Sequence, residues 1–320
     1  MAKKFRYALI TSVLALMVVF SAVVSACGSI KTKHPRAKIT VEFNSKTYVI
    51  EYTLYRNMYP QTVQHFIELA DNGFYNDMIV HSYTSSNWFT GAYSYNGASE
   101  ASDYDSAFTA GSSSVRDYLE HNSKEAAYYD LFKAGKLTPS VYKKLSYDAK
   151  GNEKVAAEDA LPALIGEFSS NDHKIKKNPV RAEYGVLKMF YYPKGDTNQK
   201  VAIKNSFGQL LEHDYKYNCA TSVFAMQVSG SDSAYGEANY CTFARLRNDG
   251  ERDKFNSLIE AVSDYITDEL DGASGDFTRQ VSVPVDTLDT FADEGGQAID
   301  TSFTTTQKPL IIKSVKITKY

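Results

Sequence analysis

The sequence predicts a mainly β fold, an antiparallel barrel or sandwich accompanied by two helices. Short strand patterns recur along most of the chain, and two amphipathic helical patterns stand among them without regular strand–helix alternation. Tyrosine is unusually common, with 24 residues against 17 Phe and 1 Trp, and aromatic residues favour the half-buried surfaces of sheets. Because a parallel α/β sheet needs alternating strands and helices, the sequence excludes that class.

The N-terminus has the pattern of an export signal. A cationic start precedes an apolar stretch at 8–24 that ends in small residues, as in secretory signal peptides. Cys27 follows directly after Ser-Ala, which resembles a bacterial lipoprotein box whose cysteine becomes the lipidated first residue. A retained membrane anchor is the alternative, but the apolar run is marginal for spanning a bilayer. We expect a signal peptide at 1–26, a tether at 27–37, and an extracytoplasmic protein that the lipid on Cys27 anchors to the cell membrane.

The folded domain, expected at 38–320, begins with a hairpin and a helix. Apolar residues alternate on both sides of a turn at 44–46, which predicts two paired strands. Pro60 suits the first turn of the helix, and Gly73 supplies its left-handed stop. A short buried strand that ends at His81 follows this helix. The apolar face of the helix consists of Val63, Phe66, Ile67 and Ala70.

Residues 98–161 have the character of a helical insertion, because strand patterns flank this segment and none lies inside it. A polar stretch at 115–134 permits a helix, and the cap and first-turn proline at Thr138-Pro139 predict a second short helix through Leu145. Residues 286–309 are expected to form a loop. Beyond the insertion, strands are expected at 164–168, 184–192, 222–228, 240–246, 281–285 and 310–317, with an amphipathic helix at 255–266.

The order of helix, Gly-Phe-Tyr, short strand, His81, loop and Trp88-Phe89 resembles the first half of a cyclophilin-type peptidyl-prolyl isomerase. Later segments are similar to family motifs in the same order. They are 166–168 (GEF) to G-x-F, 185–189 (GVLKM) to G-[IV]-[LI]-S-M, 221–225 (TSVFA) to G-S-Q-F-F and 243–246 (FARL) to F-G-x-V. The resemblance implies a closed antiparallel β-barrel with two flanking helices that acts on proline-containing polypeptides without a cofactor.

The resemblance also places a catalytic arginine directly after the histidine. Rotation about a peptide bond must cross about 18–20 kcal/mol, and in the twisted transition state the proline nitrogen becomes an acceptor for a fixed guanidinium. Here Ser82 follows His81. Removing one such donor typically costs about 10²–10³ in rate, so we expect weak or absent isomerase activity. Arg245 and Arg247 are the candidates for a replacement donor.

The substrate-binding positions that the resemblance implies begin with His81, and the others are altered. Counted without gaps from His81, Asn87, Trp88 and Thr90 stand at the family's pocket Phe, Met and Gln. Ala225 stands at the second Phe of G-S-Q-F-F. The remaining positions are Phe190 with Tyr191, which replace a small Ala-Asn pair, Tyr235 near the family's Trp and Tyr240 near its pocket His.

Other chemistry is not indicated. The net charge of −3 is balanced along the chain, which argues against nucleic acid as a partner. None of the six histidines lies three or four residues from another, so we expect no metal site. Cys219 and Cys241 could pair in an oxidising compartment or stay as isolated thiols. We expect a monomer.

Two functions remain. The first is an isomerase-like lipoprotein that assists the folding of exported proteins with weak activity. The second is a non-catalytic peptide- or protein-binding module with a cyclophilin fold at the cell surface. The missing arginine and the bulk of Phe190 and Tyr191 favour the second, whereas an open pocket with Arg245 or Arg247 directed into it would indicate catalysis.

Overall fold

The fold lies in the second of two units into which the chain divides, Met1–Thr32 and Lys33–Tyr320. Among the described residues, no helix has the length and apolar character needed to cross a membrane. Cys27, the expected lipidation site, lies outside the described residues. The computed structural model describes residues 32–95, 103–142, 146–147, 149–150, 153–154, 160–161, 164–171, 173–175, 180–190, 200–204, 209–214, 219–230, 241–285 and 299–320.

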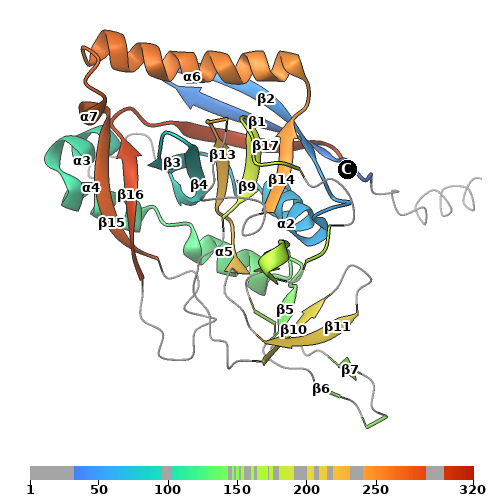
Figure 1. Cartoon of the computed structure of the whole chain (residues 1–320). Coiled ribbons are helices and arrows are strands. Elements are labelled where there is room, and N and C mark those ends of the chain that lie inside the picture. Colours follow the sequence, from blue (N-terminus) through green and yellow to red (C-terminus); the bar gives the residue numbers. More distant parts are fainter. Residues whose placement is uncertain are drawn as a thin grey trace, which may run out of the picture. The chain divides into compact units, whose positions relative to one another are not determined.

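Antiparallel strands close into a barrel, which confirms the expected fold class (Figure 1). The first and last strands pair with each other, so the barrel has no open edge. Around the barrel the order is β1 (Arg36–Phe43), β17 (Ile311–Lys319), β3 (Met78–Tyr83), β4 (Asn87–Ser94), β13 (Phe224–Gln227), β9 (Val186–Met189), β14 (Cys241–Leu246) and β2 (Lys46–Leu54).

The β1–β2 hairpin shows why alternation predicts a strand here. Ala37, Ile39 and Val41 are fully buried, whereas Lys38 between them is exposed. The hairpin turns at Asn44 and Ser45, whose φ angles of 45° and 61° are the left-handed pair that a two-residue hairpin turn requires. The hairpin and its turn are therefore as predicted.

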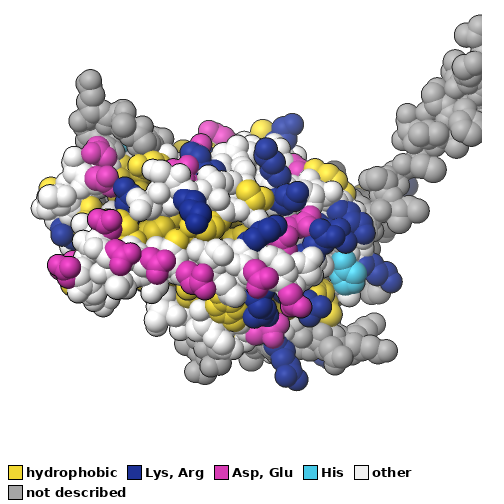
Figure 2. All heavy atoms as spheres, turned by 90° about the horizontal axis from the view of Figure 1, so that it is seen from above, with side chains coloured by type: hydrophobic (Ala, Val, Ile, Leu, Met, Phe, Trp, Pro, Cys, Tyr) yellow, Lys and Arg dark blue, Asp and Glu magenta, His cyan; other side chains and the backbone are white. Residues whose placement is uncertain are grey.

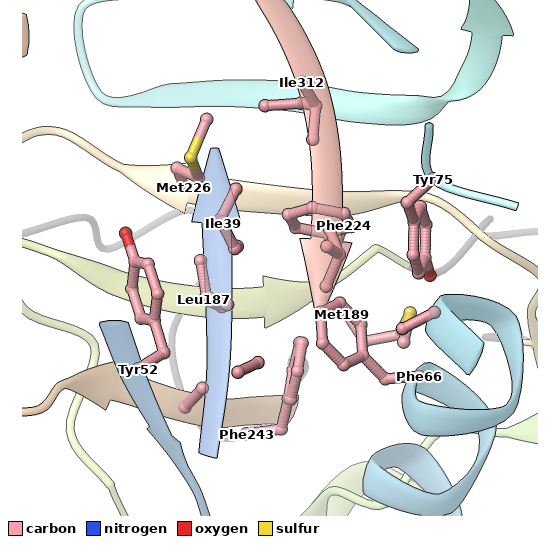
Figure 3. Close-up of a cluster of buried hydrophobic side chains, with 14 of the residues drawn as sticks. Ile39, Tyr52, Phe66, Tyr75, Leu187, Met189, Phe224, Met226, Phe243 and Ile312 are labelled. Carbon is pink, nitrogen blue, oxygen red and sulfur yellow. The ribbon is translucent and has the colours of Figure 1, made fainter. Parts of the chain in front are cut away.

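Helix α2 (Pro60–Asp71) contributes its apolar face to the barrel core (Figure 3). The Phe66 ring lies 5.0 Å from the Phe243 ring and 5.5 Å from the Phe224 ring, measured between centroids. The helix begins at Pro60, and the chain turns at Gly73 with a φ of 68°, as the sequence indicated. Its first N–H groups at Gln61 and Thr62 donate to the buried Glu167 carboxylate over 3.2 and 2.8 Å.

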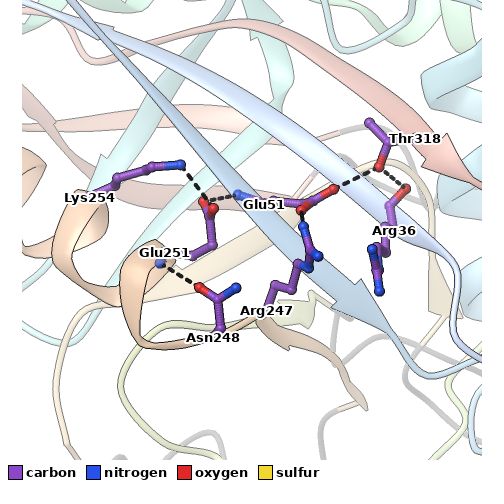
Figure 4. Close-up of polar contacts among 7 residues, drawn as sticks. All are labelled: Arg36, Glu51, Arg247, Asn248, Glu251, Lys254 and Thr318. Atoms are coloured by element: carbon purple, nitrogen blue, oxygen red, sulfur yellow. Dashed lines mark hydrogen bonds and ion pairs between the residues drawn. The ribbon is translucent and has the colours of Figure 1, made fainter.

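Helix α6 (Asp249–Glu269) packs along β2 with Phe255, Leu258 and Val262 buried. Figure 4 shows that Glu51 joins this helix to the barrel. The Glu51 N–H donates to the Glu251 carboxylate at 2.7 Å, and the Glu51 carboxylate accepts from the Arg247 guanidinium and, at 3.0 Å, from the Thr318 hydroxyl. Burial raises the pKa of Glu51, but these donors outweigh it and hold the pKa below its ordinary value.

The expected helical insertion contains strands as well as helices. Its helices are α3 (Tyr104–Ala110), α4 (Ser112–His121) and α5 (Glu125–Lys133). The prediction of a short helix after Thr138 is wrong, because strand β5 (Val141–Tyr142) follows and pairs with β10 (Lys200–Lys204). The N–H and hydroxyl of Thr138 donate to the Glu68 carboxylate and therefore do not cap a helix. The other short elements are β6 (Ser146–Tyr147), β7 (Glu153–Lys154), β8 (Leu164–Ile165), a 3-10 turn (Ser169–Asn171), β11 (Leu210–Asp214) and β12 (Cys219–Ala220).

A second hairpin lies outside the barrel wall. After the short helix α7 (Ser274–Phe277), strand β15 (Thr278–Val285) pairs along its whole length with β16 (Ile299–Thr306). The Val281-Val283-Val285 alternation predicted β15, but β16 falls in the segment expected to be a loop. That expectation is wrong: β16 is rich in threonine and carries Phe303 as its one aromatic ring. Strand β16 packs against β3, so the hairpin covers the strand that carries His81.

Candidate functional site

The candidate site is built on strands β3 and β4, whose pairing is irregular. Ser82 pairs with Phe89 and Tyr83 with Trp88, but the ladder shifts between Val80 and Ser82. His81 is therefore an extra residue in β3, as in a β-bulge. Directly paired residues share a face of the sheet, so Ser82 and Phe89 lie on one face and Tyr83 and Trp88 on the other.

Trp88 lies in the barrel core and not on the face of Ser82. Its side chain is 1% exposed, its ring stacks on that of Tyr83 at 5.5 Å, and the Phe255 ring of α6 lies 6.5 Å away. Thr90 also points inward, because it pairs with Val80 and with Phe224 of the core and its hydroxyl donates to the Ile79 carbonyl at 2.9 Å. Trp88 and Thr90, which the sequence analysis assigns to the pocket, thus both lie on the inner face of the barrel.

The outer face brings together a row of residues from neighbouring strands. Phe89 pairs with Ser82 on one side and with Ala225 on the other, and Ala225 pairs with Lys188. The Phe190 ring meets the Phe89 ring edge to face at 5.3 Å, and Val223 completes this apolar cluster. Among the predicted site residues, the structure thus gathers Ser82, Ala225 and Phe190. Phe89 is the member that sequence reasoning missed, and only the bulge at His81 could have identified it.

Lys188 is a cation in this row, but it lies too far from Ser82 to act as a donor there. Its side chain is 1% exposed. It lies three strands from Ser82, through Ala225 and Phe89, which at about 4.8 Å per strand puts their backbones about 14 Å apart. A lysine side chain does not span that distance. Lys188 therefore lies at the end of the outer row that is farthest from Ser82.

The two arginines considered as replacements are engaged on another part of the barrel. The Arg245 guanidinium lies over the Tyr55 ring at 5.5 Å. Arg247 forms its ion pair with Glu51. Neither of these two arginines therefore lies next to Ser82. The described residues do not form the open pocket, with an arginine directed into it, that would indicate catalysis.

His81 is sealed beneath the added hairpin. Its ring is 1% exposed and lies 5.1 Å from the Tyr93 ring and 4.9 Å from the Phe303 ring of β16. No described residue forms a hydrogen bond with its Nδ1. Burial lowers the pKa of His81 to about 3, so the ring is neutral at physiological pH. The ring can therefore pack against a strand but cannot serve as an acid there.

Close backbone contact holds the segment before β13 against β4. A Cβ atom on Gly91, whose φ is 101°, would lie 2.5 Å from the Ser222 carbonyl oxygen, so only glycine fits. The Ser222 hydroxyl donates to the Gly91 carbonyl at 2.6 Å, and the Tyr75 hydroxyl donates to the Ser222 carbonyl at 3.0 Å. These two bonds hold Ser222 next to Gly91 and Tyr75.

The remaining predicted residues divide into two groups. Asn87 is 1% exposed and pairs with Gln227 at the end of the outer face.

Tyr191, Tyr235 and Tyr240 lie outside the described residues, as does the side chain of Cys219. The Cys241 Sγ lies 3.5 Å from the Thr62 hydroxyl, in the core. No cluster of metal-binding side chains occurs in the part of the chain that the structure describes.

Comparison with known proteins identifies a family. The model for cyclophilin type peptidyl-prolyl cis-trans isomerases matches residues 38–248, which is more than half of the chain. No curated protein matches the chain.

Solved structures of the same kind are similar to this chain. A cyclophilin type peptidyl-prolyl cis-trans isomerase of Cryptosporidium parvum is 13% identical with a TM-score of 0.35, and the match covers 90% of this chain and 99% of that one. The Mimivirus cyclophilin is 13% identical with a TM-score of 0.30, covering 72% and 81%. At these TM-scores, the family assignment depends on the sequence match.

Proposed function

The chain belongs to the family of cyclophilin-type peptidyl-prolyl cis-trans isomerases, and we propose that its outer barrel face binds proline-containing segments of exported polypeptides while isomerising them slowly. The observation that carries this proposal is the position of Ser82 in the outer row, where it pairs with Phe89, whose other neighbour is Ala225. A family member with arginine there has a forked cation next to an apolar wall. This chain has the wall and a neutral hydroxyl.

The apolar wall supports binding of a proline ring. Phe89, Val223 and Ala225 form a cluster on the outer face, with Phe190 packed against it. These three side chains are 7%, 2% and 2% exposed, so a proline ring gains this contact by displacing the side chains that cover them, and the contact then removes the ring from water. Proline is the residue whose preceding bond populates both isomers, so a proline-binding face can hold either one.

The hydroxyl at Ser82 supports slow isomerisation. A serine side chain is short and neutral, and it cannot copy the several donors of a guanidinium. Losing one preorganised donor to the transition state costs about 10²–10³ in rate. We therefore propose an activity lower by at least this factor than that of a member with the arginine.

The place of action that we propose is the outer side of a cell membrane. The export signal and Cys27 support lipid anchoring there, and the clients would be polypeptides that fold after export. The protein would act as a monomer.

A protease-coupled isomerisation assay tests this function. The soluble chain from Gly28 onward, which contains every described barrel strand, would be compared with Ser82→Arg, with Ser82→Met as a size-matched control, and with an active cyclophilin. We expect slow turnover by the unaltered chain, acceleration by Ser82→Arg and none by Ser82→Met. An unaltered chain as fast as the active cyclophilin would contradict the proposal.

The second candidate is a binding module without catalysis. Two observations favour it: Phe190 packs its ring on Phe89, and Phe303 covers His81. Both contacts restrict the space in which a peptide bond could rotate next to β3. A peptide that binds the chain, but whose isomers exchange no faster than in water even with Ser82→Arg, would favour this candidate.

A further inference from the structure

One half of the barrel carries cations in two rows across its strands. Lys319, Arg36, Thr53 and Arg245 lie in register on β17, β1, β2 and β14. Lys316, Lys38 and Glu51 form the next row, which Arg247 extends by donating its N–H to the Glu51 carbonyl at 3.0 Å. We call this surface the basic face. Its cationic members are Arg36, Lys38, Arg245, Arg247, Lys316 and Lys319.

The charge of the basic face is open to solvent. All of its cations are exposed except Arg36, which is half-buried. Glu51 is the one carboxylate in the two rows, and it is paired with Arg247. No salt bridge joins the other five cations to any residue that the structure describes. Since the whole chain has a net charge of −3, this positive surface reflects segregation of charge and not an excess of lysine and arginine. Figure 2 shows lysine and arginine side chains more numerous toward one end of the face in view, while acidic side chains lie along the rest of that face and also among them.

The N-terminal segment joins the fold beside this face. The His34 ring packs on the Tyr55 ring at 5.3 Å, and Arg245 lies over the same Tyr55 ring. The Leu54 N–H donates to the Pro35 carbonyl at 2.8 Å. The first residues of the folded unit are thus fixed next to the row that contains Arg36 and Arg245.

Chain length then keeps the basic face near a membrane. Lys33 is the sixth residue after Cys27, and an extended chain advances at most about 3.6 Å per residue, so the two lie within about 22 Å. If Cys27 carries the lipid, as proposed above, this short tether confines the basic face close to the headgroups. Anionic headgroups attract lysine and arginine within roughly one Debye length, about 8 Å at physiological salt.

We propose that the basic face docks on anionic lipid headgroups and orients the barrel on its membrane. The strand order gives this orientation a consequence. The strands of the basic face, β17, β1, β2 and β14, are contiguous around the barrel, and β3, β4, β13 and β9 occupy the other half. Docking of the first half turns the strands that carry Ser82, Phe89 and Ala225 away from the lipid.

Lysine footprinting on vesicles tests this inference with the full chain. The chain would be reconstituted into vesicles of phosphatidylcholine with or without phosphatidylglycerol at about one third of the lipid, then acetylated and analysed by mass spectrometry. We expect phosphatidylglycerol to reduce labelling of Lys38, Lys316 and Lys319 several-fold, and about 0.5 M NaCl to restore it. The exposed Lys133 and Lys136 serve as internal controls and should label equally on both vesicles.

A charge-reversed chain with Lys38→Glu and Lys316→Glu should lose the protection at Lys319, whereas Lys133→Glu with Lys136→Glu should keep it. Equal labelling on both vesicles would overturn the inference. If soluble polyphosphate protects these lysines as strongly as the anionic vesicle does, the inference of lipid docking is overturned, and the basic face binds a soluble polyanion. The mass of the peptide that contains Cys27 reports separately whether this cysteine is lipidated. If the chain is instead anchored by an uncleaved leader, the labelling experiment still tests the basic face.

Discussion

The Phe89 and Phe190 rings meet edge to face on the outer side of the barrel, with their centroids 5.3 Å apart. Aromatic pairs in this geometry are stabilising beyond the area they bury. The Phe190 ring is half-buried and packs against the cluster of Phe89, Val223 and Ala225.

Replacing Phe190 by alanine should open the outer face. We expect Phe190→Ala to bind proline-containing peptides several-fold more tightly, because the peptide no longer competes with an internal ring for Phe89. Isothermal titration with the unaltered chain in parallel measures this difference. Weaker binding by the variant would show that Phe190 is itself part of the binding surface.

Trp88 and Phe89 are neighbours in sequence with opposite roles. Trp88→Ala should lower the free energy of unfolding by about 3–5 kcal/mol, because its ring fills the core under α6. Peptide affinity of the folded variant should not change. Phe89→Leu should weaken peptide binding and lower the free energy of unfolding by less than Trp88→Ala does. Urea denaturation and peptide titration on both variants check this, and a Trp88→Ala chain that is stable but cannot bind would contradict it.

His81 makes the fold sensitive to acid. Its pKa is about 3 in the folded chain, and an unfolded histidine titrates near about 6.5, so between these values only the unfolded state takes up the proton. The contribution of the neutral His81 ring to the free energy of unfolding is fully present above pH about 6.5. Below that pH the free energy of unfolding falls by about 1 kcal/mol per pH unit. His81→Phe keeps the ring contacts with Tyr93 and Phe303 and removes the proton site.

The His81→Phe chain should therefore lose less stability between pH about 7 and 5 than the unaltered chain. Thermal denaturation at several pH values gives the comparison. Burial also lowers the pKa of His65, to about 4, but His65 is present in both chains and cancels. Parallel curves for the two chains would show that His81 is not buried as described.

The Glu51–Arg247 pair should contribute measurably to stability. Arg247→Met leaves the Glu51 carboxylate buried with Thr318 as its remaining side-chain donor, at a cost of about 1–3 kcal/mol. The matched variant Arg245→Met, which loses only a contact over the Tyr55 ring, should cost less. Denaturant midpoints of the two variants measure the difference, and equal midpoints would contradict a special role for Glu51.

Sequence reasoning reached most of the fold because local signals agreed with tertiary structure. The hairpin turn at Asn44-Ser45, the start of α2 at Pro60 and its stop at Gly73 all follow from the backbone preferences of single residues. The buried face of α6 follows from helical periodicity alone.

What the sequence could not show depends on contacts between distant segments. An aromatic pair such as Trp88-Phe89 can present either ring to the core, and the bulge at His81 decides which one. Strand β16 owes its structure to pairing with β15 and not to an apolar pattern of its own. At Thr138, where a helix is expected to begin, the threonine instead donates to Glu68, a residue distant in sequence. The first two of these differences bear on the candidate site, because β16 packs against β3.

The most direct test of slow catalysis on a peptide-binding face is exchange NMR on a peptide with a single proline. One sample reports binding, through broadening of the peptide signals, and catalysis, through cross-peaks between its cis and trans forms. We predict saturable broadening by the unaltered chain, lost in Phe89→Leu, with exchange at least about 10²-fold slower than with an active cyclophilin at equal concentration. Exchange as fast as that of the active cyclophilin, or no broadening at all, would contradict the proposed function.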